Sequence, residues 1–237
     1  MTESDNKVAV ITGGSRGIGA TLVTAYRARG YSVVATSRSI RPATDPEILT
    51  VAGDISEPET AQRVIDAALE RFGHIDTLIN NAGVFVAKAF TEYSVEDYAH
   101  VTRVNLDGFF HVTRAAIDHM RGRSQGHVVN ITTTLVEHAS SSVPSALASL
   151  TKGGLAAVTK SLAIEYAPTG IRVNAVSPGV IKTPMHDPAD YEELGALHPL
   201  DRVGEIDDVV HGVLYLESAP FVTGEFLHID GGQSAGR

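Results

Sequence analysis

Short apolar runs alternate with longer amphipathic stretches along most of the chain. The runs are rich in β-branched residues, and several are apolar at every position, which is typical of buried parallel strands. We expect strands at Val8–Ile11, Val33–Ala35, Leu78–Ile79, Val128–Ile131, Val173–Val176 and Phe226–Ile229. The intervening stretches predict helices at Ile18–Ala28, Glu57–Phe72, Val95–Met120, Ala146–Tyr166 and Glu205–Leu216. This alternation indicates an α/β fold in which helices cover both faces of a parallel sheet.

Right-handed crossovers between such strands give a single doubly wound, Rossmann-type domain, which we expect to span residues 1–237. The chain has no Gly/Ser linker, repeat or low-complexity tract. The least regular stretch is Thr183–Val203, which contains three prolines and a cluster of acids. We predict that this stretch forms a lid or loop over the substrate.

Composition and charge indicate a soluble, cytoplasmic, globular protein. The chain has 43% hydrophobic and 20% charged residues, which excludes disordered, collagen-like and coiled-coil proteins. A formal net charge of −9 argues against nucleic-acid binding, and no apolar run reaches the length of a membrane span. The chain has no cysteine, and its ten histidines show no metal-ligand spacing, so we predict no metal site.

A glycine-rich turn lies between the first predicted strand and the first predicted helix. It reads Thr12-Gly13-Gly14-Ser15-Arg16-Gly17-Ile18-Gly19. Glycines let the backbone approach a pyrophosphate closely, and the helix N-terminus supplies free N–H donors and partial positive charge. The strand–turn–helix context favours a dinucleotide site over a purely structural turn.

Five motifs together resemble the short-chain dehydrogenase/reductase family over nearly the whole chain. The glycine turn matches the family's TGxxxGxG signature, and the other four follow in the family's order: Asn80-Asn81-Ala82-Gly83, Val104-Asn105-Leu106, Pro178-Gly179 and Asp230-Gly231-Gly232. The resemblance implies a nicotinamide dinucleotide and a homotetramer or homodimer. The cofactor-binding positions that it implies are Gly13, Ser15, Arg16, Gly17, Ile18, Gly19, Ser37, Arg38, Asp54, Ile55, Asn81, Ala82, Gly83, Lys152, Pro178, Gly179, Val180, Ile181 and Thr183.

The end of the second predicted strand favours NADP(H) over NAD(H). A carboxylate there would bind the adenosine ribose and select NAD(H), but the segment Val33–Arg38 contains none. We expect Ser37 and Arg38 to lie where a 2′-phosphate would bind, with Arg16 projecting toward the same place. Two guanidinium groups make charge-assisted contacts with a phosphate. The alternative is that both arginines are solvated surface charges.

The resemblance also implies three catalytic positions. Asn105 matches the family's asparagine, and Lys152 matches the lysine that binds the nicotinamide ribose. Thr133 stands where the family has a serine that steadies the substrate oxygen, and it keeps a hydroxyl. If the loop is shifted, Thr132 or Thr134 would take this role.

The tyrosine that donates the proton in this family has no counterpart here. Ala148 stands four residues before Lys152, and no tyrosine occurs between Tyr98 and Tyr166. General acid catalysis is typically worth about 10²–10⁴-fold in rate. The departure also opens space beside the expected nicotinamide.

Three interpretations follow from this departure. In the first, the substrate needs no tyrosine proton, as with an iminium or a quinone. In the second, another group donates the proton. In the third, the protein binds NADPH as a sensor or scaffold and catalyses little. The candidate donors are water, His138 and, less strongly, His186 and Tyr191 in the predicted lid. We predict an NAD(P)H-dependent oxidoreductase that reduces a small carbonyl, quinone or imine, with the sensor or scaffold as the alternative.

Overall fold

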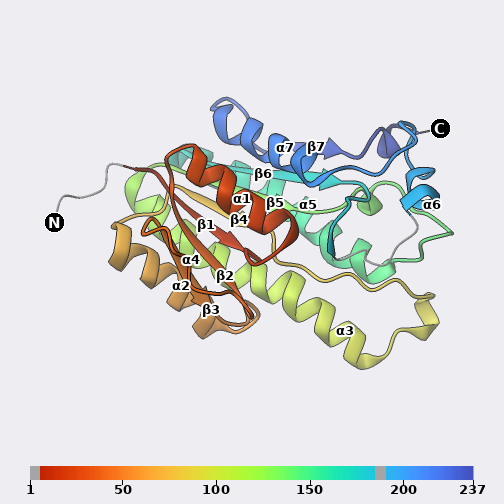
Figure 1. The fold of residues 1–237 in the computed structure, drawn as a ribbon, viewed down its shortest axis with the longest axis horizontal. Coiled ribbons are helices and arrows are strands. Elements are labelled where there is room, and N and C mark those ends of the chain that lie inside the picture. The colour runs from red at the N-terminus through yellow and green to blue at the C-terminus, as the bar shows by residue number, and fades with distance from the viewer. Residues whose placement is uncertain (1–5, 185–190, 237) are drawn as a thin grey trace.

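The computed structural model describes residues 6–184 and 191–236, in which seven parallel strands form one sheet (Figure 1). The strand order is β3-β2-β1-β4-β5-β6-β7. The strands are β1 (Val8–Thr12), β2 (Ser32–Ser37), β3 (Ile48–Ala52), β4 (Thr77–Asn80), β5 (Gly126–Ile131), β6 (Ile171–Pro178) and β7 (Phe226–Ile229). The predicted α/β Rossmann fold is confirmed. The sequence interpretation missed β3, a partly exposed edge strand with no fully buried residue.

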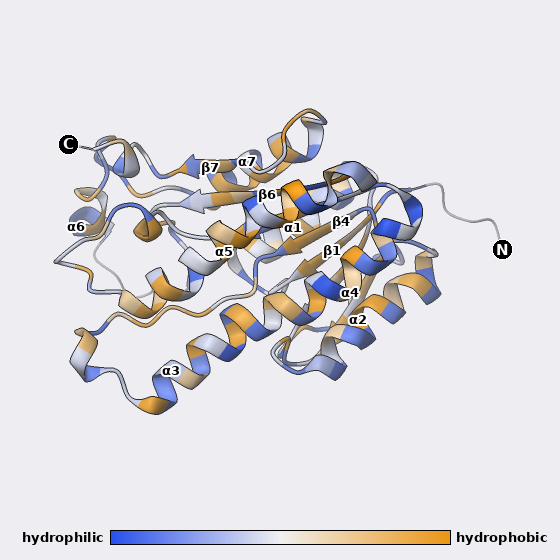
Figure 2. Ribbon diagram, turned by 180° about the vertical axis from the view of Figure 1, so that it is seen from behind, coloured by the Kyte–Doolittle hydropathy of each residue, from blue (hydrophilic) through white to orange (hydrophobic). Residues whose placement is uncertain are grey.

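Helices cover both faces of the sheet, as expected. The apolar faces of α1 (Gly17–Ala28) and α7 (Ile206–Ser218) pack on one face. On the other face lie α2 (Pro58–Phe72), α4 (Gly108–Arg123) and α5 (Ala146–Tyr166). Figure 2 shows the hydrophobic strands enclosed between helices whose outer surfaces are mixed or hydrophilic. The two apolar cores fix the strands, and therefore the loops that follow them.

The helix predicted at Val95–Met120 is interrupted in the structure. It consists of α3 (Val95–Thr102), a π-helical turn at Arg103–Asp107, and α4. The Gly108 N–H donates to the Arg103 carbonyl, which closes the wide turn. Such turns insert a residue into a helix and often occur at functional sites. This one contains the buried Asn105.

A buried carboxylate ties together the amino edge of the sheet. Glu217, near the end of α7, accepts hydrogen bonds from Tyr26 Oη at 3.1 Å, Tyr31 Oη at 3.0 Å and Thr77 Oγ1 at 3.1 Å. His127 Nδ1 lies 2.8 Å from the same carboxylate. Burial raises the pKa of Glu217, but the hydrogen bonds that it accepts from His127, Tyr31 and Thr77 outweigh this effect and lower the pKa to about 2. Burial also lowers the pKa of His127, so a neutral imidazole donates to an ionised Glu217.

The opposite, carboxyl edge is where the strand order changes direction. The chain runs outward from β1 through β2 to β3 and then returns to place β4 beside β1. Thr12 and Asn80 end these two central strands. Ligands of doubly wound sheets bind in the crevice at this switch point.

The predicted lid, Thr183–Val203, lies partly outside the described residues. Its described part contains α6 (Tyr191–Gly195), which lies beyond the carboxyl ends of β6 and β7 (Figure 1). None of the helices in the described part of the chain has the length and hydropathy that a bilayer span requires. Residues 6–184 and 191–236 also contain no group of three or more His, Cys, Asp or Glu side chains placed to share a metal ion.

Candidate cofactor and active site

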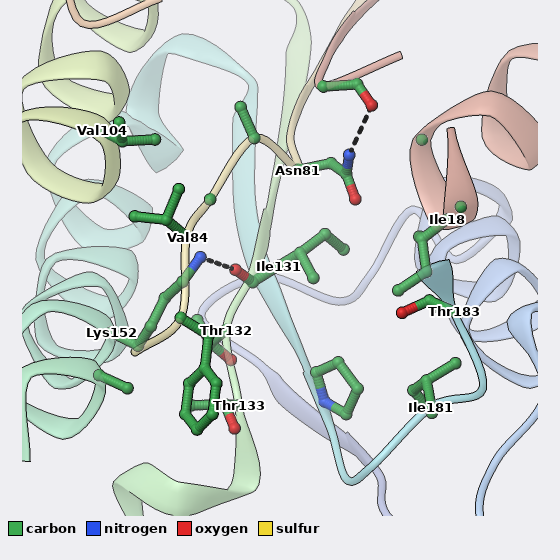
Figure 3. Close-up of a pocket in the computed structure, with 18 of the residues that line it drawn as sticks. Ile18, Asn81, Val84, Val104, Ile131, Thr132, Thr133, Lys152, Ile181 and Thr183 are labelled. Atoms are coloured by element: carbon green, nitrogen blue, oxygen red, sulfur yellow. Dashed lines mark hydrogen bonds between the residues drawn. The ribbon is translucent and has the colours of Figure 1, made fainter. Parts of the chain in front are cut away.

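A pocket of about 630 Å³ opens at the carboxyl edge of the sheet. Its wall comes from the segments that follow β1, β2, β3, β4, β5 and β6, together with α5 and residues near the C-terminus. Every cofactor-binding position predicted from the sequence lines it. In Figure 3, Asn81 and Ile18 lie on one side of the cavity, and Thr133 and Lys152 lie on another. The structure therefore brings the predicted nucleotide positions and two of the predicted catalytic positions, Thr133 and Lys152, into one space.

The glycine turn at the end of β1 has no room for larger side chains. A Cβ on Gly19 would lie 2.2 Å from the Gly13 carbonyl oxygen, and Gly13 itself has a φ of +69°. The Asn81 amide crosses the turn and donates to the Thr12 carbonyl at 2.9 Å. Thr12 Oγ1 in turn accepts from the backbone N–H groups of Asn81 and Ala82. These contacts fix the turn in a compact form that leaves its backbone open to a pyrophosphate.

The far end of the pocket, after β2, has the chemistry of an anion site. Arg16 and Arg38 are exposed and line the pocket. Thr36 Oγ1 and Ser37 Oγ are buried there, and neither has a hydrogen-bond partner among the described residues. Buried hydroxyl groups without partners are rare in folded proteins, so these two favour a bound ligand.

One carboxylate, Asp54, lies on the same wall after β3. Burial raises its pKa, but hydrogen bonds from the Ser56 backbone and hydroxyl, together with the charges of Arg38 and Arg103, lower it overall. Asp54 is therefore ionised at neutral pH. Its oxygen Oδ1 already accepts hydrogen bonds from Ser56 N at 3.0 Å and Ser56 Oγ at 2.8 Å. This oxygen therefore has little capacity left to accept a hydrogen bond from a cofactor.

Lys152 projects from α5 toward Ile131 at the end of β5 and lines the pocket (Figure 3). Its Nζ donates to the Ile131 carbonyl at 2.8 Å. Burial lowers the pKa of this ammonium to about 8. Gly83 makes room for it, because a Cβ there would lie 3.0 Å from Nζ. A cation with a pKa near neutrality therefore lies within the candidate active site.

Asn105 is 1% exposed and does not line the large pocket. Its side chain pairs with the backbone of Val84: Oδ1 accepts from Val84 N at 2.9 Å, and Nδ2 donates to Val84 O at 3.1 Å. Nδ2 also donates to Thr151 Oγ1 at 3.1 Å. The π-helical turn thus fastens the segment after β4 to α5, the helix that carries Lys152.

Three consecutive threonines follow β5, and their hydroxyl groups face different partners. Thr132 Oγ1 donates to the Val176 carbonyl at 2.9 Å, and Thr134 Oγ1 donates to Asp230 Oδ2 at 2.9 Å. Thr133 Oγ1 accepts a long contact from Leu135 N and donates to no described residue. All three line the pocket, but only Thr133 has a hydroxyl proton that is not already engaged.

Two of the predicted proton donors, His138 and Tyr191, are not among the residues that line the pocket. Ala148 lines the pocket one helical turn before Lys152. The His138 backbone N–H donates to the Thr134 carbonyl and closes a turn after the short helix at Thr134–Val136. Tyr191 begins α6 and is not a lining residue either. His186 lies outside the described residues.

Much of the remaining wall was not found from the sequence. These residues come from loops or isolated positions whose neighbours in space lie far away in the chain, so no spacing rule singles them out. They are Val84, Phe85, Leu135, Ser140, Val143, Leu197 and Gln233. Most are apolar, which makes this part of the pocket suited to an apolar molecule.

The comparisons with known proteins agree with this geometry. A family profile described as enoyl-(acyl carrier protein) reductase matches residues 13–234. A 3beta-hydroxysteroid dehydrogenase 1 from Eggerthella lenta is 35% identical over 254 aligned residues, covering 96% of this chain and 94% of that protein. The chain belongs to the short-chain dehydrogenase/reductase family. It is therefore an NAD(P)-dependent oxidoreductase of this family.

Solved structures of similar proteins hold either form of the cofactor. A tyrosine-to-phenylalanine variant of ElxO with NADPH bound is 30% identical, with a TM-score of 0.90 and coverage of 98% of this chain and all of that one. A 3-ketoacyl-(acyl-carrier-protein) reductase from Brucella melitensis, complexed with NADH, is 30% identical, with a TM-score of 0.86 and coverage of 96% and 98%. The family and the fold therefore establish a nicotinamide cofactor, and the choice between its two forms depends on this chain's own residues.

Proposed function

We propose that this protein is an NADP(H)-dependent reductase of a small, largely apolar carbonyl, quinone or imine, and that it works without a tyrosine acid. The supporting observation is the single pocket that joins two kinds of wall. One wall carries Arg16, Arg38 and the unpartnered Ser37 hydroxyl. The other carries Lys152, Thr133 and Ala148.

The residues of the first wall suit the 2′-phosphate of NADP(H). No carboxylate ends β2, and the two arginines can make charge-assisted contacts with the phosphate. Ser37 Oγ supplies a donor that the described residues leave unused. The glycine turn after β1 would hold the pyrophosphate, and the cofactor when bound supplies a hydride to the substrate.

Thr133 and Lys152 stabilise the charge that develops on the substrate. The Thr133 hydroxyl donates to an oxygen that gains negative charge during reduction of a carbonyl or quinone. The buried ammonium of Lys152 adds positive charge to a site of low dielectric, where charge interactions are strong. Asn105 holds the backbone of Val84 against the helix of Lys152 and so positions both.

Ala148 decides which substrates this arrangement suits. An alanine methyl group cannot donate a proton to a product alkoxide. An iminium becomes a neutral amine on hydride addition and needs no proton, and a quinone gives a stabilised oxyanion that solvent can protonate. These two classes are therefore favoured over unactivated ketones, for which general acid catalysis matters most.

We also propose that the protein forms a homotetramer, with a dimer as the smaller assembly. Phe110 on α4 and Leu150 and Ile164 on α5 are large apolar side chains that are more than half exposed. Tyr215 on α7 and Phe221 are likewise exposed. Light scattering at micromolar concentration tests this proposal, which a monomer would contradict.

The function is tested by NADPH oxidation against ketones, quinones and cyclic imines, with NADPH binding measured on the same sample. We expect binding together with turnover of quinones or imines, and we expect a Lys152→Met variant to lose turnover. Turnover with NADH and not NADPH would contradict the cofactor assignment. Tight NADPH binding without turnover in any class would instead support a sensor or scaffold.

A further inference from the structure

Gln233 is a buried polar side chain in the pocket wall that the proposed reaction does not use. It begins the short helix Gln233–Ala235 that follows β7, and it is 4% exposed. It lines the same pocket as Thr133, Ala148 and Lys152. Its side-chain carbonyl oxygen, Oε1, is buried and has no hydrogen-bond partner among the described residues.

The backbone around Gln233 is held firmly in place. Gln233 N donates to the Asp230 carbonyl at 3.1 Å. The Asp230 carboxylate accepts from Gly232 N at 3.0 Å, Ser234 N at 2.8 Å and Thr134 Oγ1 at 2.9 Å. The last bond connects the segment of Gln233 to the residue next to Thr133. Gln233 is therefore fixed relative to the candidate active site and does not rest on a free loop.

A buried acceptor without a donor destabilises a folded protein, and native structures contain few of them. The wall around this pocket is mostly apolar, with Phe85, Leu135, Val143 and Leu197 among its residues. No donor among the described residues bonds this acceptor, and a ligand that brings its own donor would satisfy it.

We propose that Gln233 Oε1 is a specificity-determining acceptor that selects substrates bearing an N–H or O–H group on an apolar body. This inference rests on the proposed reductase function and names its substrate class more narrowly. An analogue that lacks the donor leaves Gln233 Oε1 unpaired, and the pocket therefore binds this analogue more weakly.

The test uses phenol-bearing ketones and their methyl ethers, which differ only in the donor. The probes are 4-hydroxyacetophenone, 6-hydroxy-1-tetralone and estrone, each paired with its methyl ether, titrated onto protein saturated with NADP⁺. We expect at least one phenol to bind about 5- to 100-fold more tightly than its ether. Gln233→Met, which keeps the shape and removes the acceptor, should abolish the difference. Leu197→Met, which alters an apolar residue that lines the same pocket, should preserve it.

Two further measurements separate this proposal from the function on which it rests. The Gln233→Met variant should bind NADPH as the parent does, and its melting temperature should equal or exceed that of the parent because an unpaired buried acceptor is gone. Loss of NADPH affinity in this variant would place Gln233 in the cofactor site and overturn the proposal. The proposal would also be overturned if each phenol bound as tightly as its methyl ether, or if no phenol bound. In either case the proposed reductase function would still be supported by NADPH binding and turnover. Failure of the parent to bind NADPH would refute both.

Discussion

Restoring a phenol at position 148 should convert this enzyme into a better reductase of ordinary ketones. Ala148 and Lys152 lie four residues apart on α5, which places them on one face of the helix about 6 Å apart along its axis. Both line the pocket. In an Ala148→Tyr variant the phenol would therefore lie beside the Lys152 ammonium and the Thr133 hydroxyl.

The size of the gain follows from the charge of Lys152. A unit positive charge about 4 Å from a phenolate contributes about 4 kcal/mol at an effective dielectric of about 20. That energy corresponds to lowering the phenol pKa from about 10 to about 7, before burial opposes part of it. An acid with a pKa near the assay pH is worth about 10²–10⁴-fold, or roughly 3–5 kcal/mol of barrier.

The assay compares kcat/KM for NADPH-dependent reduction of one ketone by the parent, Ala148→Tyr and Ala148→Phe. The phenylalanine variant fills the same space without a hydroxyl, so the ratio between the two variants isolates proton donation from packing. We expect that ratio to reach at least about 10² on ketones and to stay near one on iminium substrates. Both variants should lose activity on bulky substrates that use the space beside Ala148.

Equal ketone reduction by the two aromatic variants, with NADPH binding intact, would refute this reasoning. It would mean that the position four residues before Lys152 is not the place from which a proton reaches the substrate. A fall in quinone or imine turnover with both variants would instead locate the substrate against Ala148.

Three more predictions concern the cofactor, the pH profile and stability. Arg38→Leu should weaken NADPH binding by about 10-fold or more and leave NADH within about twofold, as measured by fluorescence titration. Because burial lowers the pKa of Lys152 to about 8, its ammonium is lost as pH rises through 8, so NADPH affinity should fall above that pH and Lys152→Met should remove the dependence. Glu217→Gln should lower the free energy of unfolding by about 3 kcal/mol at pH 7, measured by urea titration, because the folded pKa of Glu217 is about 2 against an ordinary value of 4.5. The same depressed pKa means that the parent has this stability above pH 4.5 and loses it as pH falls from 4.5 to 2, whereas the variant should lack that acid-dependent loss.

The sequence predicted the sheet because its central strands are apolar on both faces. It did not predict β3, whose residues are half-covered at the sheet edge and give a weaker apolar pattern. It also predicted one unbroken helix through Val95–Met120. The π-helical turn at Arg103–Asp107 depends on contacts of Asn105 with Val84 and Thr151, which lie 21 and 46 residues away.

The cofactor-binding positions in the pocket wall could be predicted because these residues directly follow strands. Gly13, Arg38 and Asn81 each come just after an apolar run, and carboxyl ends of parallel strands meet at one edge. Gln233 gave no such signal, since burial of its amide and the absence of a partner are properties of the folded chain alone. His138 is close to Thr133 in the sequence but is not among the residues that line the pocket, so its proposed role stays a prediction.

The Glu217 cluster and the pocket occupy opposite ends of the same strands. On β5, His127 touches Glu217, while Thr132 lies just past the other end, five residues or about 17 Å away. Effects of substitutions separated by more than about 10 Å generally add. Changes that strengthen the amino edge can therefore offset the destabilisation caused by remodelling the pocket. Residues that line the pocket can therefore be exchanged for a new substrate while the hydrogen bonds around Glu217 continue to stabilise the sheet.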